Sequence, residues 1–595
     1  MIAYYSKTYM GIGETLHKYN FGLGVTGGDA INLDKYRVLL MEKRVCDVLF
    51  RFIENKPNKE LYETILAEIH EHFFDECFTR WRDNLNKTLK DEGFDLLVNT
   101  FGFETILKYL SKKFWYNRVE MARQLVGVSH FNYIKREPGK RITIAAYYRC
   151  IVNGGAQRVV AMLCNRWAEM TDGDGNPLYD VILITDDGPM ENEYELSPLV
   201  NRGYLPDFEN TRATRYEARL DAWNALINKY HIDVVVSSMW VAPCTFWDML
   251  CVKGHKSKPA FVIHSHNFCA VPYQFPGDTG QELCYSYQIC DGVVALSECD
   301  QEFVSCFAKH SAWICNPLAF NPLKVPISSY EPNRLLWLGR ISEEKSPMDS
   351  IMMMNYVVKE IPDAKLYIVG DGNQQIIERM KQLITRLHLE NNVELVGFTL
   401  DVQDYYSKSV ALICTSKYEG WSLTIGEAMA YGLPIITYDM PWLPFLQDGR
   451  GVVAVPQERY DLLAQEVISL LKHPDRISEI GEAGRQQITE VANYDIESDW
   501  KDFFTRINKG EMRKEAKQTQ ESIIIKYLSL YGYKGRNKRA VEERKRGAQQ
   551  EKRKFETEYR SLQYDFNSMQ NSLSFKIGRM ITWFPRMIRD LFVRR

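Results

Sequence analysis

The pattern of hydrophobic and polar positions divides this 595-residue chain into three stretches. Through about residue 140, apolar residues recur at helical spacing with many charges between them, which predicts a mostly helical N-terminal extension over 1–140. From residue 141, short apolar runs alternate with amphipathic segments, and after residue 510 the pattern is helical and basic. The helices expected in the extension are Lys35–Ile53, Asn58–Asp75, Phe78–Leu89 and Phe103–Leu125.

The middle stretch predicts an α/β architecture with two Rossmann-like domains, over 141–325 and 326–490. The first opens with Ile142–Tyr147, an expected strand that leads through the glycines of a G-G-A-Q-R turn into an amphipathic helix. The second opens with Arg334–Leu338, a strand followed by a second glycine turn. Further strands are expected at Val181–Thr185, Val234–Ser237, Ala260–Ile263, Val293–Ser297, Leu366–Val369, Val393–Phe398, Val410–Cys414 and Ile435–Thr437.

The tail, residues 509–595, carries two helical patterns of its own. Apolar residues at alternating spacings of four and three over 555–573 are typical of a short coiled-coil seam, which predicts either a homodimer or packing against the body. Residues 575–595 combine an apolar stripe with arginines and Trp583, which suits an interfacial helix on anionic lipid; docking on protein is the alternative. Pro585 should kink this helix or start a second one.

Charge separates this tail from the body. Residues 511–595 hold 21 Lys and Arg against 10 Asp and Glu, so the tail is basic while the rest of the chain is acidic. A basic tail predicts an anionic surface as partner, and because no nucleic-acid-binding motif accompanies it, we expect a membrane rather than nucleic acid. The sequence shows neither a leader pattern nor an apolar run of membrane-spanning length, so the expected location is cytoplasmic, peripheral on the inner face of the plasma membrane.

Several candidate functional residues lie between Cys414 and Thr437. An apolar run ending at Cys414 is followed by Glu419 and Gly420, and Ser422 opens a helix that carries Glu427. The start of a helix offers unpaired N–H groups and partial positive charge, which suit the phosphates of a sugar nucleotide. The alternative for this spacing alone is an ordinary strand–turn–helix unit with solvated glutamates.

Other candidate residues follow expected strands. Arg340 and Lys345, five residues apart after Arg334–Leu338, could place two cations on one diphosphate. His264 and His266 come directly after the strand at Ala260–Ile263, where ligands collect in open α/β sheets. The thirteen cysteines are scattered without a C-x-x-C pair, so we expect reduced core residues, and no set of residues predicts a metal site.

The spacing from Glu419 to Glu427 before A-M-A-Y-G-L-P resembles the E-x7-E signature of retaining glycosyltransferases of the family-4 type, which have the GT-B fold of two facing Rossmann-like domains. G-G-A-Q-R at 154–158 and G-R-x-x-x-x-K at 339–345 resemble further motifs of that family, in the same order. The resemblance covers about residues 141–508 and implies that 491–508 form a helix crossing back to the first domain.

The resemblance also implies roles for individual residues. Glu419 would contact the donor sugar and Glu427 the nucleotide ribose, while Arg340 and Lys345 would bind the pyrophosphate. His266, with His264 as the alternate, would lie near the reacting sugar carbon. The remaining expected donor-binding residues are Gly154 and Gly155, which the resemblance implies, and Gly420, Trp421 and Ser422, which lie between the two glutamates.

The function implied is transfer of a sugar, with retention, from a nucleoside-diphosphate sugar that we expect to be UDP-linked, without metal or other cofactor. The acceptor expected from the tail is a growing, lipid-linked cell-surface glycan. Alternatives are a soluble or protein acceptor, epimerisation of a UDP-sugar, and a non-catalytic glycan-binding subunit with the same fold.

Overall fold

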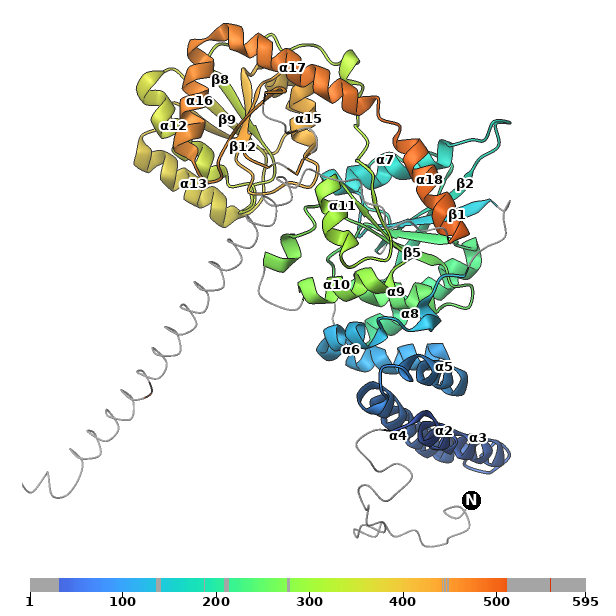
Figure 1. Ribbon diagram of the computed structural model, residues 1–595. Coiled ribbons are helices and arrows are strands. Elements are labelled where there is room, and N and C mark those ends of the chain that lie inside the picture. Colours follow the sequence, from blue (N-terminus) through green and yellow to red (C-terminus); the bar gives the residue numbers. More distant parts are fainter. Residues whose placement is uncertain are drawn as a thin grey trace, which may run out of the picture. The chain divides into compact units, whose positions relative to one another are not determined.

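The computed structural model describes residues 31–134 and 141–510, apart from gaps at 153, 187, 208–212, 275–278, 441, 444–445 and 447–448, and also Thr557 (Figure 1). The predicted coiled-coil seam at 555–573 and interfacial helix at 575–595 therefore lie outside the described residues, apart from Thr557 alone. Within the described part, no helix combines the length and the apolar character that crossing a bilayer requires.

The described part of the N-terminal extension is helical, as predicted. Helix α4 runs unbroken from Lys59 to Asn84, so the expected Asn58–Asp75 and Phe78–Leu89 are wrong as separate helices. The expected helix Lys35–Ile53 is divided at Met41 into two helices, and α5 was not predicted. The helices of the extension are α2 (Leu33–Leu40), α3 (Glu42–Ile53), α4 (Lys59–Asn84), α5 (Lys90–Phe101) and α6 (Phe103–Leu125).

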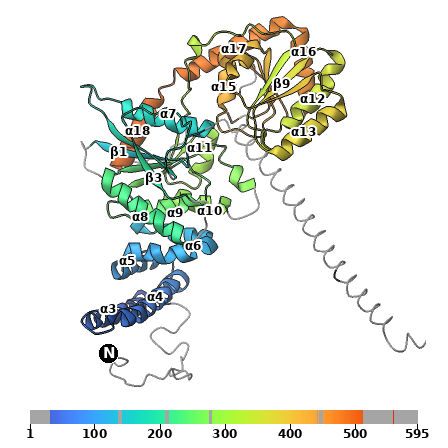
Figure 2. The ribbon, with the colours of Figure 1, turned by 180° about the vertical axis from the view of Figure 1, so that it is seen from behind.

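The first Rossmann-like domain is built on a parallel seven-stranded sheet of order β3-β2-β1-β4-β5-β6-β7. Its strands are β1 (Ile142–Tyr147), β2 (Tyr179–Asp186), β3 (Val200–Leu205), β4 (Val234–Ser237), β5 (Ala260–His264), β6 (Gly292–Ala295) and β7 (Ser311–Trp313). Helices lie on both faces of this sheet, as Figures 1 and 2 show from opposite sides. They are α7 (Gly155–Glu169), α8 (Ala213–Tyr230), α9 (Cys244–Gly254), α10 (Thr279–Ile289) and α11 (Glu298–Ser305).

The second Rossmann-like domain has a parallel six-stranded sheet of order β10-β9-β8-β11-β12-β13. Its strands are β8 (Arg334–Leu338), β9 (Lys365–Val369), β10 (Val393–Gly397), β11 (Ala411–Cys414), β12 (Ile435–Tyr438) and β13 (Val452–Val455). Its helices are α12 (Pro347–Glu360), α13 (Gln374–Leu387), α14 (Val402–Lys408), α15 (Leu423–Ala430), α16 (Tyr460–Lys472) and α17 (Pro474–Ala492). Both sheets are wholly parallel, so the α/β class predicted from the pattern is confirmed.

After α17 the chain returns to the first domain as α18 (Ile496–Lys509). Trp500 of this helix packs edge-on against Trp167 of α7, with ring centroids 4.9 Å apart, and lies 5.4 Å from the ring of His264. Phe504 contacts the same two tryptophans. These aromatic contacts fix α18 behind the strand that carries the candidate histidines.

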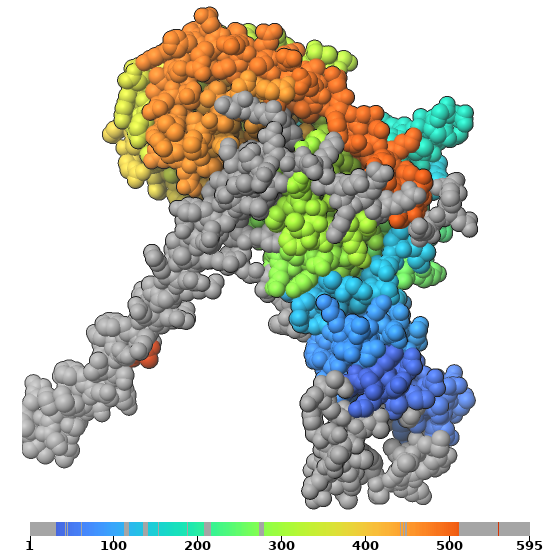
Figure 3. All heavy atoms as spheres, in the orientation of Figure 1, coloured from blue at the N-terminus to red at the C-terminus, as the bar shows by residue number. Residues whose placement is uncertain are grey.

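The N-terminal extension shares one hydrophobic core with the first domain, since Trp81 and Leu97 of the extension belong to the same buried cluster as Val235 and Phe261 of the sheet. Its helix α6 packs on α8, α9 and α10. At that junction Ser111 donates a hydrogen bond to Glu217 at 3.2 Å, and Arg118 pairs with Glu282. Figure 3 shows the blue helices of the extension against the cyan and green surface of the first domain.

Candidate active site

Loops at the carboxyl ends of the two sheets meet at Gly420. A Cβ added to Gly420 would lie 2.6 Å from Cα of Asn267 and 2.8 Å from the carbonyl oxygen of His266, so the two backbones touch here. Beside this contact, the rings of Phe268 and Trp442 stack with centroids 4.2 Å apart. Gly420 stays a predicted donor-binding residue, and the structure adds that the backbone of the first domain lies against it.

Glu419 and Lys345 form an ion pair at this meeting point. Lys345 Nζ donates to Glu419 Oε1 at 2.5 Å, and Ser416 Oγ donates to the same oxygen at 2.6 Å. The Glu419 side chain is only 9% exposed, while that of Lys345 is 23% exposed. Burial alone would lower the pKa of Lys345, but the Glu419 carboxylate outweighs it and holds that pKa above its ordinary value. Lys345 is therefore a fixed positive charge at neutral pH.

The loop that carries Lys345 is held to the neighbouring strand by a chain of hydrogen bonds. Trp337 Nε1 donates to Thr415 Oγ1 at 2.9 Å, and Thr415 Oγ1 donates to the carbonyl of Lys345 at 2.9 Å. Trp442 Nε1 donates to the carbonyl of Glu419 at 3.0 Å. The backbones on both sides of the ion pair are thus positioned by buried donors.

Arg340 lies on the same loop as Lys345 and pairs with a carboxylate there. Its side chain is 73% exposed, and its Nη2 pairs with Glu344 on the same loop at 2.8 Å. Burial raises the pKa of Tyr148, in the first domain, and the Arg340 charge opposes that rise, so the guanidinium lies near that tyrosine. Arg340 is therefore an exposed cation close to both Glu344 and Tyr148 of the first domain.

His264 is the last residue of β5 and His266 follows two residues later, with their ring centroids 4.2 Å apart. Burial lowers the pKa of His266 to about 3 and lowers that of His264 well below its ordinary value, so both rings are neutral at pH 7. Ser238 Oγ lies 3.4 Å from His264 Nδ1. Among the described residues, the enclosed Nε2 of His266 has no hydrogen-bond partner. His266 can therefore serve a ligand as a neutral hydrogen-bonding group.

Glu427 bridges the two domains. Its Oε1 accepts from Arg158 Nη1 of α7 at 2.9 Å, and its Oε2 accepts from Tyr406 OH at 3.0 Å. Burial, and then the Glu427 charge, raise the pKa of Tyr406 well above its ordinary value, so this hydroxyl remains a donor. Neither partner was predicted. Arg158 stands in the G-G-A-Q-R turn that the sequence singled out, whereas nothing local distinguishes Tyr406.

The glycine turn and the start of α15 face each other. A Cβ on Gly155 would lie 3.6 Å from Leu423 Cδ1, and Gly154 N–H donates to Tyr194 OH at 3.3 Å. Ser422 is the N-cap of α15 with φ 53°, an uncommon backbone region for serine, and its hydroxyl lies 3.3 Å from that of Thr424 rather than capping the helix. Trp421 is buried beside it. The amino end of α15 thus keeps N–H groups without a side-chain cap.

Comparison with protein families places these residues. Residues 324–487 match the family described as "Glycosyl transferases group 1". They form a group 1 glycosyltransferase domain. This domain contains Arg340, Lys345, Glu419 and Glu427, while His266 and Arg158 lie in the first domain, outside the matched range.

Two curated relatives of the chain act in polymer synthesis by their names. A poly(glycerol-phosphate) alpha-glucosyltransferase of Bacillus subtilis is 29% identical over 231 residues, which are 37% of this chain and 33% of the relative. An amylovoran biosynthesis glycosyltransferase of Erwinia amylovora is 27% identical over 164 residues, 26% of this chain and 45% of the relative. The chain thus spans less than half the length of either relative.

Among solved structures, the sucrose-phosphate synthase of Thermosynechococcus elongatus superposes with a TM-score of 0.51 at 19% identity. The match covers 62% of this chain and 99% of that protein. Together with the two parallel sheets, this likeness shows that the group 1 domain belongs to a GT-B fold, as the motif order predicted.

No group of three or more His, Cys, Asp or Glu side chains within the described residues is arranged to hold a metal ion. Among the described residues, Lys345, Glu419, Glu427 and Arg158 form ion pairs at or beside the two loops that meet, and Arg340 pairs with Glu344 on the Lys345 loop. These charges, with two neutral histidines and a helix start that has no side-chain cap, could bind an anionic, hydroxyl-bearing ligand.

Proposed function

We propose that the chain is a retaining glycosyltransferase that moves a sugar from a nucleoside-diphosphate sugar to a hydroxyl of a growing glycan. The observation that carries this proposal is the Lys345–Glu419 ion pair, which lies in the group 1 domain where Gly420 meets the His266–Asn267 backbone. A cation, a carboxylate and a neutral imidazole then converge where the reacting sugar would lie.

The residues suggest how the donor would be held. Glu419 uses Oε1 for Lys345 and Ser416, so its Oε2 is available to accept from a sugar hydroxyl. Lys345 and the N–H groups at the start of α15 would bind the diphosphate, and Arg340 would join them by turning from Glu344. Glu427 would accept from the ribose hydroxyls, in exchange for Arg158 or beside it.

The proposed reaction breaks the bond between the sugar's anomeric carbon and a phosphate oxygen and forms a bond from that carbon to the acceptor oxygen. The acceptor's proton passes to the departing phosphate, on the face that the leaving group vacates. Lys345 and the helix end stabilise the charge that develops on that phosphate, which is electrostatic catalysis. His266 is neutral, so it would hydrogen-bond the sugar rather than act as an acid.

Metal independence and retention belong to this proposal. The cations on the chain can supply the charge that a bound divalent ion supplies elsewhere. Retention is supported by the name of the B. subtilis relative, which specifies an alpha product: from an α-configured donor, an α product means retention. We further propose a UDP-linked donor.

The acceptor we propose is a lipid-linked cell-surface glycan. Both relatives carry names of polymer-building enzymes, and the basic tail suits the anionic inner face of the plasma membrane, where such acceptors are extended. The chain would act there as a peripheral protein.

The test is transfer itself. The purified protein is incubated with a panel of nucleotide sugars and a lipid-extracted acceptor fraction, and the anomeric configuration of the product is determined by NMR. We expect one donor to give an α-linked, lipid-soluble product. An inverted product would refute retention, and transfer only to soluble or protein acceptors would refute the lipid-linked acceptor.

A further inference from the structure

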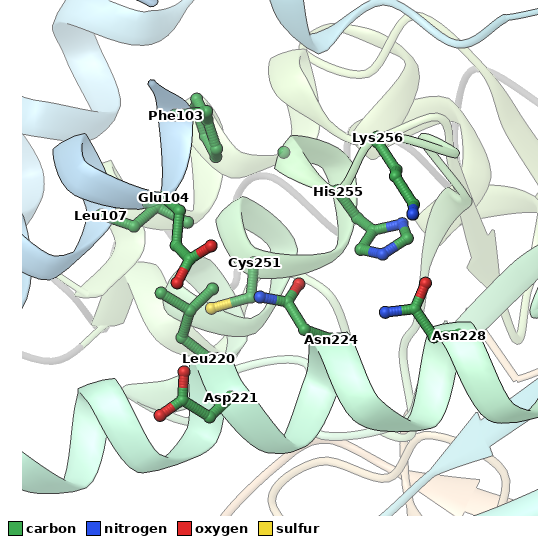
Figure 4. A pocket seen from close by; sticks show the side chains of 11 residues that line it. Phe103, Glu104, Leu107, Leu220, Asp221, Asn224, Asn228, Cys251, His255 and Lys256 are labelled. Atoms are coloured by element: carbon green, nitrogen blue, oxygen red, sulfur yellow. The ribbon is translucent and has the colours of Figure 1, made fainter. Parts of the chain in front are cut away.

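A pocket of about 450 Å³ opens between α6 of the N-terminal extension and α8 and α9 of the first domain (Figure 4). We call it the α6–α8 pocket. Its volume is within the range of small-ligand sites, roughly 300–1,000 Å³. It is lined by Phe103, Glu104, Leu107, Leu220, Asp221, Asn224, Asn228, Cys251, Gly254, His255 and Lys256.

The N-terminal extension and the first domain are in close contact at this pocket, through Phe103 and Gly254. A Cβ added to Gly254 would lie 1.6 Å from the Phe103 ring, so α6 sits directly on the end of α9. The Phe103 ring also stacks on His130, with ring centroids 4.9 Å apart. Phe103 is therefore a fixed aromatic part of the lining, and the buried Leu107 and Leu220 add apolar lining.

The opposite wall is polar. Asn224 and Asn228 project from the same side of α8, one turn apart, as Figure 4 shows. Within the part of the chain that the structure describes, no hydrogen bond engages either amide. Each amide offers two donors and an acceptor, and the carboxylates of Glu104 and Asp221 add further acceptors.

An aromatic wall beside paired donors and acceptors matches a ring that has both apolar C–H faces and hydroxyl groups. A phosphate-rich polymer suits the lining less well, because Lys256 is the one cation among the eleven lining residues and two carboxylates oppose it. We propose that the α6–α8 pocket binds neutral sugar residues of a glycan.

The pocket lies near the amino ends of the strands of the first sheet, whereas the candidate active site lies at their carboxyl ends. Gly254 and His255 precede β5, while His266 follows it, so the two sites lie toward opposite ends of this five-residue strand, which is about 16 Å long. A glycan held in the α6–α8 pocket would therefore be bound far from its reacting hydroxyl. That this glycan is the acceptor rests on the proposed function, and the pocket would then favour longer acceptors.

The test is binding of neutral hexasaccharides of glucose, galactose and N-acetylglucosamine to the full chain, measured by ligand-observed NMR. An oligomer of glycerol phosphate serves as the polyanionic probe. We expect at least one neutral hexasaccharide to bind the wild type. Asn224→Ala/Asn228→Ala should weaken that binding at least about tenfold, because two hydrogen-bonding amides are lost. Asn391→Ala, which removes an exposed amide elsewhere, should not.

The proposal is overturned if no neutral hexasaccharide binds, if the double variant binds as well as the wild type with an unchanged melting temperature, or if only the glycerol phosphate oligomer binds. Should the double variant fail to fold, Asp221→Asn, on an exposed position, takes its place with the same expected direction. Donor hydrolysis by the wild type is measured separately. Its absence would count against the proposed function and leave the sugar-binding result standing.

Discussion

At the scale of single residues, the buried His266 makes the stability of the folded protein depend on pH. Its pKa in the folded protein is about 3 because the ring is enclosed, against about 6.5 in an unfolded chain. A depressed folded-state pKa contributes stability that is present above pH 6.5 and is lost as the pH falls toward 3. Between pH 6.5 and pH 5 this amounts to at most about 2 kcal/mol.

We therefore expect His266→Asn to unfold with a shallower loss of stability between pH 6.5 and pH 5 than the wild type. The measurement is urea unfolding at a series of pH values, with His72→Asn, an exposed histidine, as the control. Parallel curves for wild type and His266→Asn would show that this imidazole is not held neutral.

The Lys345–Glu419 ion pair leads to a second prediction, on stability and on nucleotide-sugar affinity. Lys345→Met leaves a buried carboxylate with Ser416 as its side-chain donor, and we expect a loss of about 1–3 kcal/mol, less than for a fully buried pair because Lys345 is 23% exposed. Adding Glu419→Gln should recover most of this stability, because no unpaired charge remains. It should not restore nucleotide-sugar affinity. Thermal unfolding and calorimetry check the two parts, and recovery of affinity would contradict the account.

At the scale of elements, Gly420 sets how closely the two loops meet. Gly420→Ala would place a methyl group 2.6 Å from the Asn267 backbone, which cannot move as a side chain can. We expect a loss of about 1–3 kcal/mol and donor hydrolysis reduced at least tenfold, since the loops must separate. Gly173→Ala, where a Cβ meets nothing within 4 Å, is the control. Unchanged hydrolysis in Gly420→Ala would mean that the contact does not shape the site.

Helices α7 and α15 are joined by the Arg158–Glu427 pair, which occupies the carboxylate proposed for the ribose. If the nucleotide takes the place of Arg158, then Arg158→Met should raise nucleotide affinity by up to about fivefold, the equivalent of about 1 kcal/mol for a partly exposed pair. As a control, Arg166→Met changes another arginine of α7, which pairs with Glu497 of α18, and it should leave nucleotide affinity unchanged. Weaker binding by Arg158→Met would assign the arginine to the nucleotide itself.

The elements also show what local sequence can predict. The bounds of β1, β4 and β8 agree with expectation because each is a mostly apolar run that is buried in the interior of a parallel sheet. The polar edge strand Val200–Leu205 and the three-residue Ser311–Trp313 lack such a run and were missed. Helix α5 was missed. Gly93 within it packs closely against Leu85 and Trp81, and only the packed structure reveals this contact.

Over the whole molecule, motif order predicted the GT-B arrangement, while the pairings across it were not predictable. Lys345 and Glu419 are 74 residues apart, and Arg158 and Glu427 are 269 apart, so their contacts depend on how loops from different strands converge. The resemblance implies that Arg340 joins Lys345 as a diphosphate ligand, which stays a prediction; in the structure its guanidinium pairs with Glu344. Long side chains of this kind follow local charge partners that a motif does not encode.

We propose a nucleotide-sugar site that works through Lys345 and Glu419 without metal. The most direct measurement is calorimetric titration of a panel of nucleotide sugars in the presence of EDTA, comparing the wild type with Lys345→Ala, Glu419→Ala and the exposed control Lys381→Ala. We predict that one nucleotide sugar binds the wild type and the control, and that the two site variants each lose at least about tenfold in affinity. Failure of every nucleotide sugar to bind the folded wild type, or binding only after a divalent cation is restored, would contradict the account.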